Sequence, residues 1–147
     1  MPVIADILFA HPCAQIDWVV EESMAPLVQR LSGINRVIPI ALRRWKKNWF
    51  SSKTQQERRN FKQALQQSVY DIVADCQGLI KSACVARLAR LTPEGLRGSF
   101  ANSSQACSYE WPVKFLLPNN QPMPDRIHAI ARSRLLVSKL LGYEVQG

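Results

Sequence analysis

Apolar positions in the first third of the chain form two patterns, a helical repeat over residues 14–33 and a nearly continuous apolar run over residues 36–42. Across residues 14–33 they repeat every three or four positions, which predicts a helix that ends at Gly33. Pro26 lies inside this segment and is expected to kink or split that helix. Residues 36–42 are β-branched and apolar but contain Pro39, so we expect an extended segment or an edge strand there.

The longest periodic stretch covers residues 54–92 and predicts one long central helix. Thr54 and Glu57 have the spacing of a capping box at its start. Gly78 would bend this helix, and Pro93 would end it. The apolar stripe comprises Phe61, Leu65, Val69, Ile72, Cys76, Leu79 or Ile80, Cys84, Leu88 and Leu91.

The last third changes character, because Gly, Ser, Asn and Pro predict loops between residues 95 and 124. Residues 109–117 predict one strand in spite of Pro112, and a final helix is expected from Asp125 to Leu141, stopped by Gly142. The expected fold class is therefore mostly α: a compact helical domain with one long central helix and minor β content, with room for a small ribbon. A length of 147 residues with 47% apolar positions suits one domain over residues 1–147.

Charge is concentrated in one segment of the chain. The formal net charge is +8, and residues 36–62 hold nine cations against a single acid, Glu57, while the rest of the chain is balanced. Such a patch attracts polyanions. The residues expected to contact phosphates are Arg43, Arg44, Lys46, Lys47, Arg58, Arg59 and Lys62, with a possible second patch at His128, Arg132 and Lys139.

The segment 42–50, which reads LRRWKKNWF, combines this charge with large apolar side chains. Drawn as a helix, it places Leu42, Trp45 and Trp49 on one face. The tryptophans then have three alternatives: core packing, stacking on unpaired bases, or anchoring a protein partner together with Phe50.

No catalytic motif stands out, and the chain is expected not to be an enzyme. There is no P-loop, GxSxG, HExxH or dinucleotide fingerprint. His11 and Cys13 flank a proline and form no interpretable dyad, and the cysteines lack zinc spacing. We therefore expect no cofactor and no metal. The N-terminus makes a poor signal peptide and no apolar run approaches the ~20 residues of a membrane span, so we expect a cytoplasmic protein without integral membrane insertion.

Two functional hypotheses follow from these patterns. In the first, the chain is a small non-enzymatic nucleic-acid-binding or accessory protein. Its residues 36–62 bind the phosphate backbone of DNA or RNA. In the second, an adaptor or regulatory subunit binds an acidic protein partner through Trp45, Trp49 and Phe50. Residues 1–33 are acidic whereas residues 36–62 are basic, so head-to-tail homo-oligomers are also possible.

Overall fold

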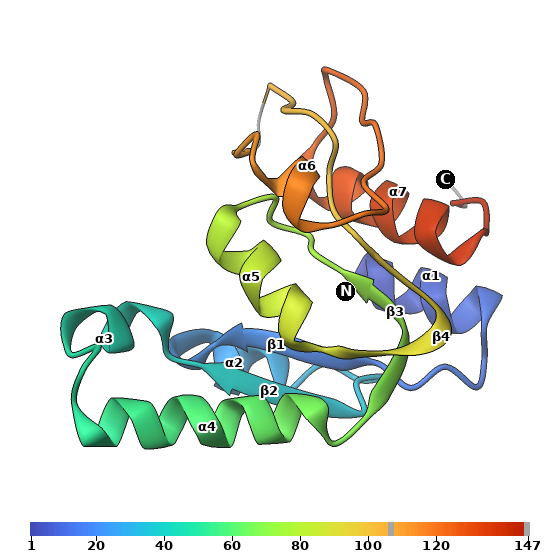
Figure 1. Ribbon diagram of the computed structural model, residues 1–147. Helices are drawn as coiled ribbons and strands as arrows, with labels where there is room; N and C mark the ends of the chain where they lie inside the picture. Colours follow the sequence, from blue (N-terminus) through green and yellow to red (C-terminus); the bar gives the residue numbers. More distant parts are fainter. Residues whose placement is uncertain (106–107, 146–147) are drawn as a thin grey trace.

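The protein is an α/β structure in which parallel strands lie between helices (Figure 1). The structure, a computed structural model, describes residues 1–105 and 108–145. Its strands form two parallel two-stranded sheets, β1–β2 and β3–β4. The expectation of a mostly helical domain is therefore wrong, and Cys107 lies outside the described residues.

The first sheet replaces the helix expected over residues 14–33. Strand β1 (Asp17–Glu21) pairs in parallel with β2 (Arg36–Ile40), and the connection holds a 3-10 turn, η1 (Glu22–Met24), and a short helix, α2 (Ala25–Val28). All five β1 residues are half-buried, so this strand is covered on both faces and shows no alternation that would separate it from a helix. The extended segment expected at residues 36–42 is confirmed as β2.

The long central helix expected over residues 54–92 is wrong, because four elements occupy residues 52–98. They are α4 (Ser52–Gln66), β3 (Val69–Ala74), α5 (Ile80–Leu88) and β4 (Arg90–Gly98). Ser51, not Thr54, caps α4: its Oγ accepts a hydrogen bond from the Thr54 N–H at 3.1 Å. Gly78 adopts a φ of +70° in the turn before α5, which ends any helical path there.

Pro93 lies inside strand β4 rather than at a helix end. The β3–β4 register jumps between the pairs Tyr70↔Leu91 and Ile72↔Leu96, so β4 bulges at the proline. A residue in a bulge does not have to donate a backbone hydrogen bond to the neighbouring strand. Proline, which has no N–H, is therefore tolerated at this position of the strand.

The C-terminal third also departs from expectation. The strand expected at residues 109–117 is wrong, because Pro112 precedes a short helix, α6 (Val113–Leu116). The final helix, α7 (Ala129–Leu141), begins one turn later than expected, with the His128 Nδ1 accepting the Ile130 N–H at 3.3 Å. Its end at Gly142, which has a φ of +75°, is confirmed.

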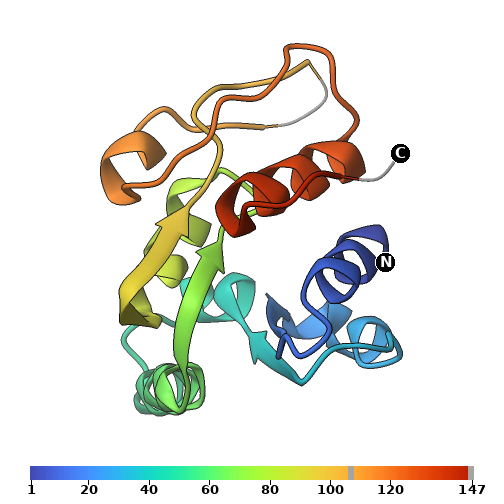
Figure 2. The same ribbon diagram turned by 90° about the vertical axis from the view of Figure 1, so that its right-hand side faces the viewer.

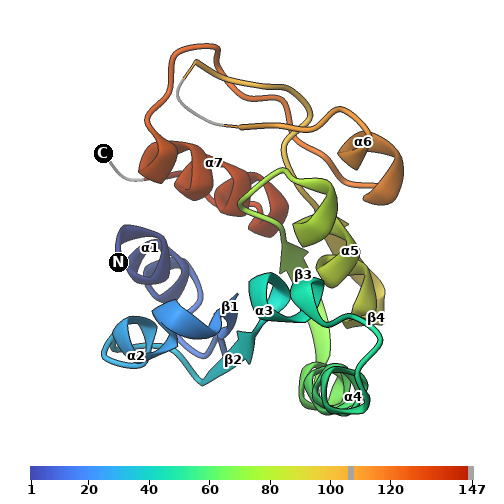
Figure 3. The ribbon, with the colours of Figure 1, turned by 90° about the vertical axis from the view of Figure 1, so that its left-hand side faces the viewer.

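Helices cover both sides of the strands. Helices α4, α5 and α6 lie on one side, and α1 (Pro2–Ala10), α2 and α7 on the other (Figure 3). Strand β3 shows the alternation this requires: Val73 packs towards α4, α5 and α6, whereas Ile72 and Ala74 pack against α7. The core is thus divided between two faces of the strand layer.

The two ends of the described chain lie side by side. Helix α1 packs against α7 (Figure 2). Arg134 on α7 binds Asp6 on α1 through two hydrogen bonds of 2.6 and 3.0 Å. This contact joins residues 128 positions apart in the sequence.

Candidate functional site

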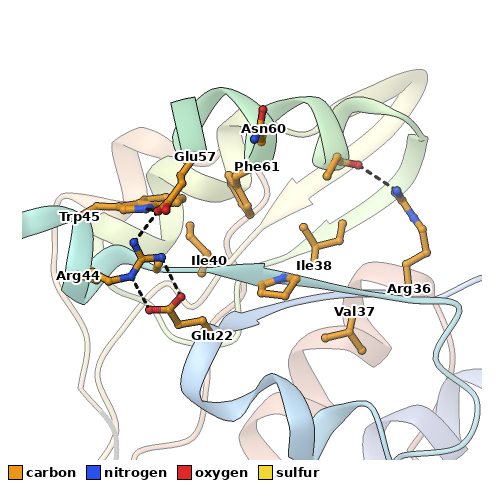
Figure 4. Close-up of a pocket in the computed structure, with 13 residues that line it drawn as sticks. Glu22, Arg36, Val37, Ile38, Ile40, Arg44, Trp45, Glu57, Asn60 and Phe61 are labelled. Atoms are coloured by element: carbon orange, nitrogen blue, oxygen red, sulfur yellow. Dashed lines mark hydrogen bonds and ion pairs between the residues drawn. The ribbon is translucent and has the colours of Figure 1, made fainter. Parts of the chain in front are cut away.

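A groove of about 520 Å³ lies between strand β2 and helix α4 (Figure 4). Its apolar part is formed by Ile38 and Ile40 of β2 and by Phe61 of α4. Polar side chains stand at the rim: Glu22, Arg36, Arg44, Glu57 and Asn60. A groove with an apolar base and few convergent polar groups is the usual form of a ligand site.

Arg44 clamps three elements at one end of this groove. Its Nε and Nη2 donate to the two carboxylate oxygens of Glu22, both at 3.0 Å, and its Nη1 donates to Glu57 Oε2 at 2.7 Å (Figure 4). Helix α3 (Leu42–Lys47) is thereby tied to η1 and to α4. Because its guanidinium already serves two carboxylates, Arg44 has little left to offer a phosphate.

The same clamp sets the protonation of the two carboxylates. The hydrogen bonds from Arg44 lower the pKa of Glu22. The hydrogen bond from the Trp45 indole, followed by that from Arg44, lowers the pKa of Glu57. The pKa of Arg44 is raised by its bonds to Glu22 and then to Glu57. Both carboxylates therefore stay ionised at neutral pH.

The structure separates the two tryptophans of the basic segment. Trp45 is only 5% exposed, contacts Phe61 edge-on at a centroid distance of 6.1 Å and donates from Nε1 to Glu57 at 2.8 Å. Helix α3 ends at Lys47, so Trp49 lies beyond it and does not share its buried face. Trp49 is 42% exposed and stacks under Arg58, whose guanidinium carbon lies 3.8 Å from the ring centroid. Phe50 projects almost fully into solvent.

Five of the seven expected phosphate contacts are exposed on α3 and α4 beside the groove. Across residues 1–105 and 108–145, no carboxylate lies within ion-pairing distance of any of them. The clamp of Arg44 holds their two helices together. They are Arg43, Lys46, Lys47, Arg59 and Lys62, here called the basic rim.

The expected second patch does not exist as a surface. Arg132 is 1% exposed, lies 3.6 Å from the centroid of the Phe100 ring and donates to the Asn102 carbonyl at 3.0 Å. Lys139 donates to the carbonyl of Pro122. Of these three residues only His128 and Lys139 are exposed. The helical spacing therefore placed Arg132 on the wrong face of α7.

Sequence reasoning missed the acids of the site. Glu22 lies in the segment expected to be a helix over residues 14–33 and was given no role, and Glu57 was expected in a capping box. A signal was present, because Glu57 is the single acid among nine cations of residues 36–62. Such an isolated carboxylate is a natural partner for a neighbouring arginine.

No helix of the described residues has the length and apolar character needed to cross a membrane. Within the same residues, no cluster of three or more His, Cys, Asp or Glu side chains is placed to hold a metal ion.

Comparison with known proteins gives one consistent result. The sequence profile of glycosyltransferase family 9 (heptosyltransferase) matches residues 58–146. Lipopolysaccharide heptosyltransferase 1 of Escherichia coli K12 is 39% identical over 97% of this chain, and that of Pseudomonas aeruginosa is 37% identical over 97%. The chain spans less than half of these relatives, 43% and 39% of their lengths.

Solved structures agree with the sequence matches. The E. coli heptosyltransferase WaaC with ADP superposes with a TM-score of 0.87 and 37% identity, over 99% of this chain and 43% of that one. The same enzyme with ADP-2-deoxy-2-fluoro heptose gives a TM-score of 0.86 and 36% identity, over 99% and 44%. Both likenesses cover the whole strand layer described above.

These findings overturn the functional hypotheses drawn from the sequence. The relatives are enzymes, so the expectation of a non-enzymatic protein is wrong. The nucleic-acid-binding, adaptor and regulatory roles are wrong for the same reason, because neither the profile nor any of these relatives has such a function. The concentration of positive charge in residues 36–62 is present in the sequence, but it does not make the chain a nucleic-acid-binding protein. The chain belongs to glycosyltransferase family 9.

Proposed function

We propose that this chain takes part in transferring a heptosyl group to lipopolysaccharide. The observation that carries the proposal is the 39% identity to lipopolysaccharide heptosyltransferase 1 over nearly the whole chain. The likeness to a heptosyltransferase solved with ADP-2-deoxy-2-fluoro heptose supports a nucleotide-sugar donor. Because the chain spans less than half of these relatives, the donor, the acceptor and the complete reaction all belong to the proposal.

We assign the basic rim to the anionic acceptor rather than to the donor. Diphosphates in α/β folds usually bind a glycine-rich turn that leads into a helix N-terminus. The basic rim has no such turn; its cations stand on the flanks of α3 and α4 and spread over an open surface. That arrangement suits an extended ligand with several phosphate or carboxylate groups, each met by one lysine or arginine.

The groove carboxylates have a supporting role in this proposal. A general base must take up a proton from the acceptor hydroxyl, and its pKa is best placed near the working pH. The pKa values of Glu22 and Glu57 are lowered instead, through hydrogen bonds from Arg44 and from Trp45 with Arg44. These two acids therefore hold α3 and the basic rim in position and do not receive the proton.

The test compares two double variants that each remove two positive charges. Lys46→Gln with Lys47→Gln removes two of the five charges of the basic rim, and Arg30→Gln with Arg126→Gln removes two exposed cations elsewhere. Binding of heptose-free lipopolysaccharide and of ADP-heptose is measured separately by calorimetry. We expect the rim variant to bind the lipopolysaccharide about tenfold more weakly, as the loss of two exposed charge contacts implies, and the control to bind within about twofold of wild type.

Two results would contradict the proposal. The first is a wild-type chain that binds neither heptose-free lipopolysaccharide nor ADP-heptose. The second concerns the assignment of the rim: a rim variant that loses ADP-heptose and keeps the acceptor would move these cations to the donor site.

A further inference from the structure

A second exposed surface lies on helices α5 and α6, away from the groove. Trp111 and Phe115 are 66% and 71% exposed, and Ile80 and Leu88 of α5 are also exposed. The two helices are neighbours, because Val113 and Leu117 pack against α5 and the Glu110 carboxylate, just before α6, accepts a hydrogen bond from the Ile80 N–H at 2.6 Å. These four apolar residues, with the cations described next, are here called the α5–α6 face.

The exposure of the two aromatic rings follows from how α6 packs. Val113 and Leu117 are fully buried against Ala83 and Ala86 of α5. That contact uses the inner side of the short helix, so Trp111 and Phe115, four residues apart, stand together on the outer side. Their rings meet edge-on with centroids 5.9 Å apart. The pair is therefore fixed in an orientation that points away from the core.

One cation lies beside these rings, and two more are exposed on α5. Lys114 Nζ lies 5.0 Å from the Phe115 centroid and 5.9 Å from that of Trp111. Lys81 and Arg87 are exposed on α5, and none of these three cations is within ion-pairing distance of a carboxylate of the described residues. Glu110, the adjacent acid, already caps the start of α5.

One cation of this face, Arg87, lies close enough to a neighbouring arginine to affect its pKa. Burial, and after it the charge of Arg87, lowers the pKa of Arg97. Its Nε is also buried without a hydrogen-bond partner in the described structure. Like-charged groups gather here without the carboxylates that usually compensate them.

We propose that the α5–α6 face binds the surface of an anionic lipid bilayer. Trp111 and Phe115 enter the interface between headgroups and acyl chains, where amphipathic aromatic rings are favoured. Lys81, Arg87 and Lys114 meet headgroup phosphates, each contributing to the attraction of the charged surface. The apolar stems of these cations lie along the same boundary.

A bilayer fits this face better than a protein partner for two reasons. The rings project from α6 and from the turn before it, and both are more than half exposed. A protein partner would need a concave surface shaped to these rings, whereas a fluid interface accepts a projecting pair. The unpaired cations beside the rings also call for an anionic partner with an apolar interior, and both properties are present in one bilayer.

This inference goes beyond the proposed transferase function and stands on different residues. The basic rim lies on α3 and α4, whereas the α5–α6 face carries the lipid contact. A soluble, deacylated heptose-free acceptor therefore separates the two. If the wild-type chain does not bind this soluble acceptor, the result counts against the proposed function. If it binds the soluble acceptor but not the vesicles, the result counts against the lipid contact.

The experiment measures partition of the 147-residue chain onto vesicles by co-sedimentation. One vesicle set is phosphatidylcholine with about 30% phosphatidylglycerol, and the other is phosphatidylcholine alone. The test variant is Trp111→Ser with Phe115→Ser. The matched control is Phe9→Ser with Leu27→Ser, which removes two similarly exposed apolar side chains from α1 and α2. Thermal unfolding confirms that both variants remain folded.

We expect wild type to bind the anionic vesicles and the test variant to bind them at least about tenfold more weakly. The control should stay within about twofold. Replacing Lys81 and Lys114 by Gln should weaken binding to the anionic vesicles and lower the preference for them over neutral ones. The blue shift of tryptophan emission on binding should be much smaller in Trp111→Phe, because Trp111 is the indole that enters the interface.

Three results would overturn the inference. Equal vesicle binding by wild type and the Trp111→Ser, Phe115→Ser variant would show that these rings do not contact lipid. Absence of wild-type binding to anionic vesicles would exclude the bilayer. A dimer in sedimentation velocity that Trp111→Ser with Phe115→Ser dissolves would assign the face to a second copy of the chain instead.

Discussion

Trp45 and Trp49 stand four residues apart in the basic segment, and replacing each by alanine should have very different effects on stability. Trp45 is buried, packs edge-on against Phe61 and binds Glu57 through its indole N–H. Removing a buried tryptophan side chain costs about 3–5 kcal/mol in the free energy of unfolding. The free energy of unfolding of a domain is about 5–15 kcal/mol, so Trp45→Ala should remove a large part of the stability of this chain.

Trp49→Ala is the matched control, because it removes the same side chain from a half-exposed site. Trp49 stacks on Arg58, and an exposed cation–π pair contributes about 0.5–1 kcal/mol. For a chain of this size, 1 kcal/mol shifts the melting temperature by about 2–4 °C. We therefore expect a drop of about 6–20 °C for Trp45→Ala and of less than about 4 °C for Trp49→Ala.

The measurement is thermal and urea unfolding followed by far-ultraviolet circular dichroism, with the urea slope compared between variants. Equal losses for the two variants, or a larger loss for Trp49→Ala, would refute the assignment of Trp45 to the core. The position of α3 over the groove would then need revision, because Trp45 is its buried anchor.

Two further predictions concern the strand layer. Burial alone would raise the pKa of Asp17, but the hydrogen bonds from Arg36, Asn35 and Tyr70 outweigh it and leave the pKa lowered from 3.8. The ionised Asp17 therefore contributes stability above about pH 4, and this contribution is lost as the pH falls through the lowered pKa. Asp17→Asn should lower the free energy of unfolding by about 2–3 kcal/mol at pH 7. The same substitution should make the free energy of unfolding depend less on pH in the acid range. A Cβ on Gly98 would overlap the Asn119 backbone carbonyl, so Gly98→Ala should cost about 2–3 kcal/mol in urea unfolding. Gly142→Ala meets no atom within 4 Å but places alanine at a φ of +75°, so it should cost only the backbone strain of about 1 kcal/mol. An Asp17→Asn profile parallel to that of wild type would contradict the first prediction, and a Gly98→Ala midpoint at or above that of Gly142→Ala would contradict the second.

The sequence predicted elements well where one face meets solvent. Helix α4 has an exposed polar face, so its period was visible, and the cap residue Ser51 lies only one turn from the expected start. Strand β3 lies between helix layers, with Val73 on one side and Ile72 on the other. Asp71 is the single polar residue of β3, so the sequence of the strand shows no sustained period of two, and its apolar residues continued the helical stripe of α4 without an obvious break.

The candidate site was predicted in part for a related reason. The cations of the basic rim are local in sequence, so their cluster could be found by counting charges. The groove could not be found in this way, because it needs the distance between β2 and α4. Arg44 reaches Glu22 across 22 positions, and such pairings depend on the register of strands that the sequence pattern did not reveal.

The contact between α1 and α7 constrains the order in which the chain folds during synthesis. Arg134 must have left the ribosome before it can bind Asp6, so α1 remains without its partner helix until nearly the whole described chain has emerged. Elements such as β1 and β2, whose partners lie about 20 positions apart, can pair much earlier. Val3 and Ile4 share one buried cluster with Val137 of α7 and with residues of the first sheet and its connections, so this cluster stays incomplete during the interval. The contact of α1 with α7 is thus among the last to form as the described chain folds.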